Sequence, residues 1–120
     1  MKKFSSLILM LVFLFSCTPA PAPVQAFKVL DGTAITVDNC MKALGDFYRA
    51  GKINDIQKDE IIKIYEVYRI AAQAANTVIK TWYQASPNAT DTPPEVTKAL
   101  NDVNTKATSV LTIAKLYGVK

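Results

Sequence analysis

One apolar stripe constrains this chain more than any other feature of its sequence. Between Asn54 and Tyr83 the apolar residues recur at alternating steps of four and three: Ile61, Tyr65, Tyr68, Ala72, Ala75, Ile79 and Trp82. This spacing places them on one face of an α-helix, and no Gly or Pro interrupts the stretch. Because a helix cannot cover its own apolar face, the stripe predicts an all-α fold in which other helices pack against this one.

Two further segments have apolar faces of the same kind. We expect a first helix over 37–50, capped by Thr36 and ended by Gly51, which suits the left-handed position after a helix. The long helix is expected over 54–84, with Asn54 at the start of a capping box. The last helix is expected over 93–117, after a capping Thr92 and with Pro93 as its first residue. The short turns between them predict an antiparallel, up-down-up three-helix bundle.

The first residues have the features of a secretory signal. Two lysines precede an apolar run over 4–15, which is too short to span a bilayer and is typical of a signal peptide. The run ends with Leu14 and Ser16 placed three and one residues before Cys17. This ending resembles the lipobox of bacterial membrane lipoproteins.

The resemblance implies that the chain is attached to a membrane by a lipid anchor. It implies that 1–16 is removed as a lipoprotein signal peptide and that Cys17 then carries diacylglyceryl and N-acyl groups, such as palmitate. Several acyl chains hold a protein firmly on a bilayer, whereas one chain does so only marginally. Thr18 after the cysteine implies that, in a host with two membranes, the protein is sorted to the outer membrane and faces the periplasm.

The segments between the lipobox and the first expected helix have their own patterns. Pro19, Pro21 and Pro23 alternate with other residues and predict an extended spacer over 17–26, holding the domain at 27–120 roughly 20–25 Å from the anchor. Asp31 and Gly32 lie between short apolar runs. This pattern is compatible with a short β-hairpin at 27–36 that lies on the bundle.

The expected helices differ in length, and the one at 37–50 is too short to cover the other two. It would leave a groove at the Trp82 end, lined by Ala72, Ala75, Ile79, Trp82, Val96, Leu100 and Val103. A bare apolar patch of this kind is unusual for a monomer. Two interpretations remain open: the segment 27–36 folds over the groove, or the groove binds a protein partner or a second copy of the chain.

The residue patterns of catalysis are missing from the sequence. It has no histidine, no metal-ligand spacing and no phosphate-binding loop. The clustered carboxylates Asp59, Glu60 and Glu66 are interpreted as part of a solvated helix face. We therefore predict no enzyme activity, no metal, no cofactor and no small-molecule substrate. Cys40 is interpreted as a buried core residue, with a reactive or intermolecular thiol as the alternative.

The charge of the mature chain also excludes one class of partner. Loss of Lys2 and Lys3 leaves 12 of the 14 basic residues, against 10 acidic ones. A surplus of two is too small to indicate binding to an anionic partner, whether nucleic acid or anionic lipid.

Together these patterns predict a lipid-anchored helical protein of the bacterial cell envelope that acts as a non-catalytic interaction or scaffold module. One alternative is a lysis or exclusion lipoprotein of a phage or mobile element, because the chain is small and lacks catalytic residues. Another is a structural link to the cell wall, because the C-terminal Lys120 makes the chain faintly similar to murein lipoprotein.

Overall fold

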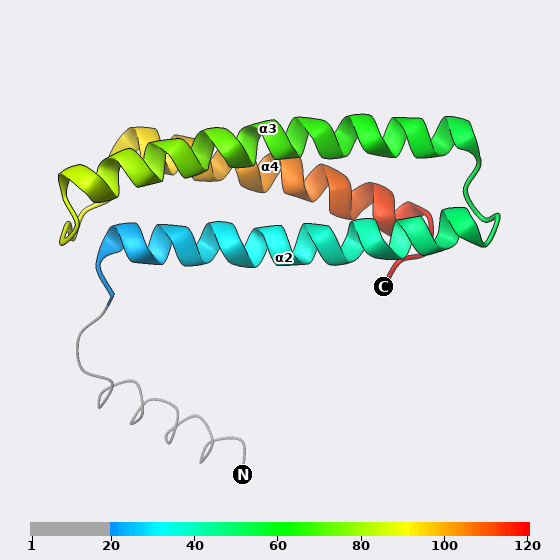
Figure 1. Ribbon diagram of the computed structural model, residues 1–120, viewed down its shortest axis with the longest axis horizontal. Coiled ribbons are helices and arrows are strands. Elements are labelled where there is room, and N and C mark those ends of the chain that lie inside the picture. Colours follow the sequence, from blue (N-terminus) through cyan, green and yellow to red (C-terminus); the bar gives the residue numbers. More distant parts are fainter. Residues whose placement is uncertain (1–19) are drawn as a thin grey trace, which may run out of the picture.

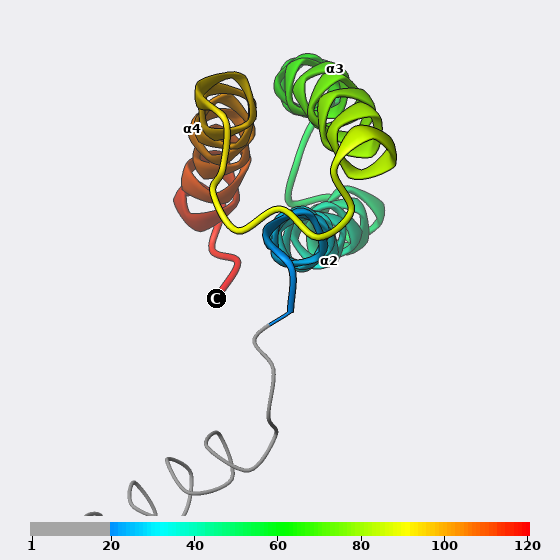
Figure 2. The ribbon, with the colours of Figure 1, turned by 90° about the vertical axis from the view of Figure 1, so that its left-hand side faces the viewer.

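The computed structural model describes residues 20–120, which form three antiparallel helices (Figure 1). These are α2 over Ala22–Arg49, α3 over Asp55–Ala85 and α4 over Pro94–Leu116. Seen from one end, the three helices occupy the corners of a triangle (Figure 2). No strand occurs in this part of the chain, and the prediction of an all-α, up-down-up three-helix bundle is confirmed.

The first helix is longer than the sequence analysis predicted, because it begins at Ala22 instead of residue 37. The hairpin at 27–36 is therefore wrong, and the extended spacer cannot reach residue 26. Two physical reasons account for the difference. A proline in the first turn costs no helical hydrogen bond, so Pro23 is compatible with a helix start. Ala26 and Leu30 are buried against α3 and α4, and this packing outweighs the local turn preference of Asp-Gly.

The capping predictions have mixed outcomes. Asn54 and Gln57 form the expected capping box, with backbone-to-side-chain hydrogen bonds of 2.8 and 3.0 Å. Thr36 is no cap, because it lies inside α2 and donates to the carbonyl of Gly32 at 3.0 Å. Thr92 is no cap either. The helix starts one residue later than expected, with Pro93 at the cap position.

The turn that ends α2 depends on Gly51 as predicted, and the turn that ends α4 depends on Gly118. Gly51 and Gly118 have φ angles of 79° and 97°, values in the left-handed region that other residues adopt at a cost. The turn at Gly51 lets α3 fold back along α2. The connection between α3 and α4 is longer and lies at the opposite end of the bundle, beside the start of α2 (Figures 1 and 2).

The core runs along the whole bundle as two clusters. The larger cluster joins all three helices and includes Val37, Ile79, Val96 and Val110, all fully buried. The smaller cluster lies near the α2–α3 turn and contains Leu44, Ile53, Ile61, Ile113 and Ala114. Within residues 20–120 no charged residue is buried, and the buried residues are apolar apart from the hydroxyl of Tyr68, so the bundle is held mainly by apolar packing.

Candidate interaction surface

The predicted partner groove is filled by the chain itself. Its members are all in the larger core cluster or packed against it: Ala72, Ala75, Ile79, Trp82, Val96, Leu100 and Val103. The first half of α2 covers them with Ala26, Phe27 and Leu30. The prediction of an open groove is therefore wrong. Of the two interpretations, the segment 27–36 does cover the gap, but as a helix.

The predicted lipidation site, Cys17 with Leu14 and Ser16, lies outside the described residues. The structure shows where the chain that follows it joins the bundle. The amide of Ala22 donates a hydrogen bond of 2.9 Å to the carbonyl of Ala89. The start of α2 is thereby tied to the loop between α3 and α4.

One face of α3 exposes large apolar side chains to solvent. Ile56, Val67 and Ile70 are 80%, 49% and 63% exposed. With Lys63 and Ala74 they lie on one face of the helix, at successive steps of seven, four, three and four residues. We call these five residues the α3 outer face.

The sequence analysis did not identify the α3 outer face, although its apolar residues can be seen in the sequence beside the longer apolar stripe that forms the core. A cluster of exposed apolar side chains on one face often marks a protein interaction site. The α3 outer face is therefore the strongest candidate for such a site in the described part of the chain.

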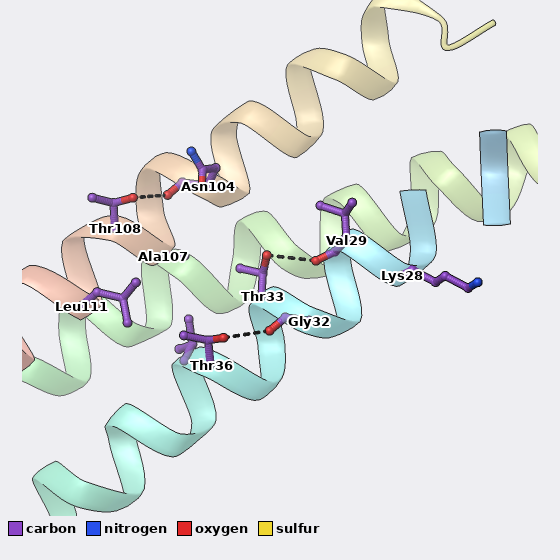
Figure 3. A pocket seen from close by; sticks show the side chains of 10 residues that line it. Lys28, Val29, Gly32, Thr33, Thr36, Asn104, Ala107, Thr108 and Leu111 are labelled. Carbon is purple, nitrogen blue, oxygen red and sulfur yellow. Dashed lines mark hydrogen bonds between the residues drawn. The ribbon is translucent and has the colours of Figure 1, made fainter. Parts of the chain in front are cut away.

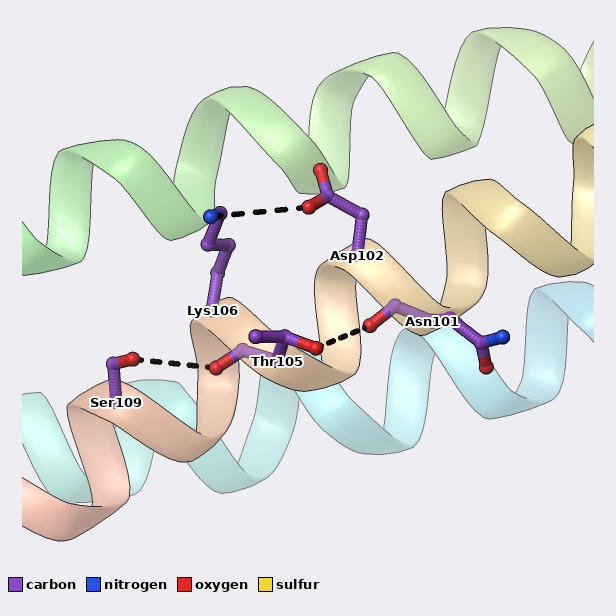
Figure 4. Close-up of polar contacts among 5 residues, drawn as sticks. All are labelled: Asn101, Asp102, Thr105, Lys106 and Ser109. Atoms are coloured by element: carbon purple, nitrogen blue, oxygen red, sulfur yellow. Dashed lines mark hydrogen bonds and ion pairs between the residues drawn. The ribbon is translucent and has the colours of Figure 1, made fainter.

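The solvent-facing side of α4 is polar instead. The hydroxyls of Thr105 and Ser109 donate to backbone carbonyls one turn earlier, at 2.9 and 3.3 Å (Figure 4). Asp102 and Lys106 form an i,i+4 ion pair at 3.9 Å. Hydroxyls that already bond the backbone have no free proton to donate to a ligand, and an exposed ion pair adds little stability. This face is an ordinary solvated surface.

A groove of about 360 Å³ separates α2 from α4 (Figure 3). Its threonines are also engaged with the backbone, since Thr33, Thr36 and Thr108 donate to the carbonyls of Val29, Gly32 and Asn104 at 2.9, 3.0 and 2.7 Å. The only titratable residue that lines it is Lys28, whose side chain points away from Asn104 and Thr108 in Figure 3. The hydroxyls of the groove are therefore all engaged with the helix backbone.

A smaller apolar hollow of about 220 Å³ lies between α2 and α3 near their turn. At its rim Tyr48 donates a 2.5 Å hydrogen bond to Asp55, and the ammonium of Lys58 lies 4.6 Å from the centre of the Tyr48 ring. The hydrogen bond with Tyr48, followed by its charge, raises the pKa of Lys58. These contacts support the turn structurally.

Cys40 is half-buried and packs against the smaller core cluster. No group of three or more potential metal ligands occurs in residues 20–120. None of the three helices combines the length and the apolarity that a membrane-crossing segment needs.

Comparison with known proteins gives no relative. No family model, no curated protein and no solved structure matches the chain.

Proposed function

We propose that this chain is a lipid-anchored protein of the bacterial cell envelope whose bundle is a non-catalytic interaction module. In this proposal Cys17 holds the protein on a membrane, and the α3 outer face binds a helix of a partner protein. The observation that carries the proposal is the exposure of Ile56, Val67 and Ile70 on a single helix face. The resemblance of the first residues to a lipobox supports the anchor.

The spacing of the α3 outer face favours a helix as the bound element. From Lys63 to Ala74 its residues follow the alternation of four and three that is also found in the stripe covered by α2 and α4 on another side of α3, and Ile56 lies two turns before Lys63. Side chains in such rows form ridges that fit between the ridges of a second helix. No described acidic group lies within ion-pair distance of Lys63, so this lysine is available to a carboxylate of the partner.

The anchor is tested by labelling cells with radioactive palmitate. We expect label in the wild-type protein and none in a Cys17→Ser variant, which should also wash off membranes. Equal labelling of the two forms, or release of the wild-type protein by a salt wash, would contradict the anchor.

The surface is tested with a photocrosslinking amino acid placed at Ile70 in cells. Ile35 is a matched control, because it is 62% exposed compared with 63% for Ile70 and lies on α2 instead. We expect Ile70 to give a discrete adduct that Val67→Lys abolishes, and Ile35 to give none. Equal adducts from both positions, or no adduct from either, would count against the α3 outer face. An adduct with the mass of two copies would assign this face to self-association.

A further inference from the structure

The chain between the proposed anchor and the bundle is short. Helix α2 begins at Ala22, five residues after Cys17 in the sequence. A fully extended chain advances at most about 3.6 Å per residue, so this connection spans about 18 Å or less. The bundle cannot stand far from a membrane that holds Cys17.

The end of the bundle nearest to Cys17 is nearly free of charge. It consists of the start of α2, the last turn of α3 and the loop 86–93 (Figures 1 and 2), and we call it the anchor end. Among residues 20–27 and 84–94 the only charged side chain is that of Asp91, and the next charged residues along the chain are Lys28, Lys80 and Glu95.

The opposite end of the bundle is much more highly charged. The charged residues around the α2–α3 turn and in the last residues of the chain are Asp46, Arg49, Lys52, Asp55, Lys58, Asp59, Glu60, Lys115 and Lys120. Charge is thus distributed unequally along the long axis of the molecule.

Aromatic side chains gather at the anchor end. Tyr83 is 41% exposed and packs edge-to-face with Phe27, with ring centroids 6.1 Å apart. Trp82 is half-buried and lines a hollow of about 400 Å³ between α3 and α4, together with Thr81, Ala85, Glu95 and Val96. Trp and Tyr are enriched where proteins meet the headgroup region of a bilayer, because their rings are apolar and their N–H or O–H groups remain hydrated.

We propose that the anchor end rests in the headgroup region of a phospholipid bilayer, with Trp82 and Tyr83 as interfacial contacts. This inference depends on the proposed lipid anchor at Cys17 and adds a second contact with the same membrane. The short connection, the lack of charge and the aromatic pair all occur at one end. The bundle then stands on the membrane, and Ile56 lies about 39 Å along α3 from Trp82, away from the lipid.

Trp82 is the only tryptophan of the chain, so its fluorescence reports the position of the anchor end directly. The experiment uses the full lipidated protein in phosphatidylcholine vesicles, some with bromine on the acyl chains near the headgroup. We expect the emission of Trp82 to be weaker in brominated vesicles than in plain ones. We also expect its maximum in plain vesicles to lie at a shorter wavelength than without vesicles. The matched control combines Trp82→Phe with Ile56→Trp, and its emission should be the same in both kinds of vesicle.

The outcomes separate the inference from the proposed function. If the protein sediments with the vesicles but bromine leaves Trp82 emission unchanged, the anchor stands and the inference is wrong. If the protein stays in the supernatant, both are wrong. If bromine does not quench Trp82 and the protein sediments as a dimer, the anchor end contacts a second copy of the chain instead of the bilayer. A Tyr83→Glu variant adds charge at an exposed site, and we expect less quenching from it with unchanged sedimentation.

Discussion

Replacement of Gly32 by alanine tests the largest difference between the sequence analysis and the structure. Gly32 lies inside α2, and a Cβ added there would meet no atom within 4 Å. Glycine inside a helix is less stable than alanine by roughly 0.5–1 kcal/mol, because it loses more backbone freedom on folding. We therefore expect Gly32→Ala to raise the free energy of unfolding by about that amount.

The sign of this effect distinguishes a helix from a hairpin. A two-residue Asp-Gly turn would hold Gly32 at positive φ, where alanine is strained, and the substitution would then lower stability. Gly51→Ala is the control for that case, because Gly51 has a φ of 79°. We expect Gly51→Ala to lower the free energy of unfolding by about 1 kcal/mol.

The assay is urea unfolding of the chain from residue 18 to residue 120, followed by the helical circular dichroism signal. With a slope of about 1–3 kcal/mol per molar urea, a change of 1 kcal/mol moves the midpoint by roughly 0.3–1 M. We expect the urea midpoint to be higher than that of the wild type for Gly32→Ala and lower for Gly51→Ala, with the same dependence of the unfolding free energy on urea in all three proteins. A midpoint for Gly32→Ala below that of the wild type would refute a continuous α2.

Three further substitutions test the packing, the cap and the buried hydroxyl. Ile79→Ala removes a fully buried side chain and should cost about 2–5 kcal/mol in the same urea assay; a cost below 1 kcal/mol would contradict a tightly packed core. Asn54→Ala breaks the capping box and should cost about 1 kcal/mol, whereas Ser86→Ala, at a helix end without a side-chain cap bond, should cost less. The hydroxyl of Tyr68 is buried without a hydrogen-bond partner, and burial raises the pKa of Tyr68 above 10.0. In the unfolded chain Tyr68 therefore loses its proton at a lower pH than in the folded protein, so the free energy of unfolding should fall as the pH rises above about 10. Tyr68→Phe should reduce this fall, and an identical pH profile for the two proteins would show that Tyr68 is not responsible.

Much of the fold could be predicted because long apolar periods and clear helix boundaries agree. The capping residues of α3 and the glycines after α2 and α4 are local features, and local features can be read from a sequence. The first half of α2 could not be identified in this way. Val29, Thr33, Ile35 and Thr36 are β-branched, and Gly32 is a poor helix former, so local preference favoured strand and turn. Burial of Leu30 against α3 and α4 overrides that preference, and it depends on contacts between distant parts of the chain.

The candidate surface was missed for a related reason. The apolar residues of α3 follow two overlapping periods, and both are compatible with a core face. Only the arrangement of α2 and α4 decides that Ile79 is buried while Ile70 is exposed. The predicted open groove has the same origin. A first helix that begins at residue 37 would leave the groove uncovered, whereas α2 begins at Ala22 and covers it.

The hydrogen bond between Ala22 and Ala89 fastens the start of α2 to the loop between α3 and α4. A pull at Ala22 directed along the axis of α2 would have to slide the side chains from Pro23 to Leu44 past α3 and α4 together. A sideways pull at the same residue would separate these contacts one turn at a time. A load along α2 should therefore be carried longer before unfolding than a load across it.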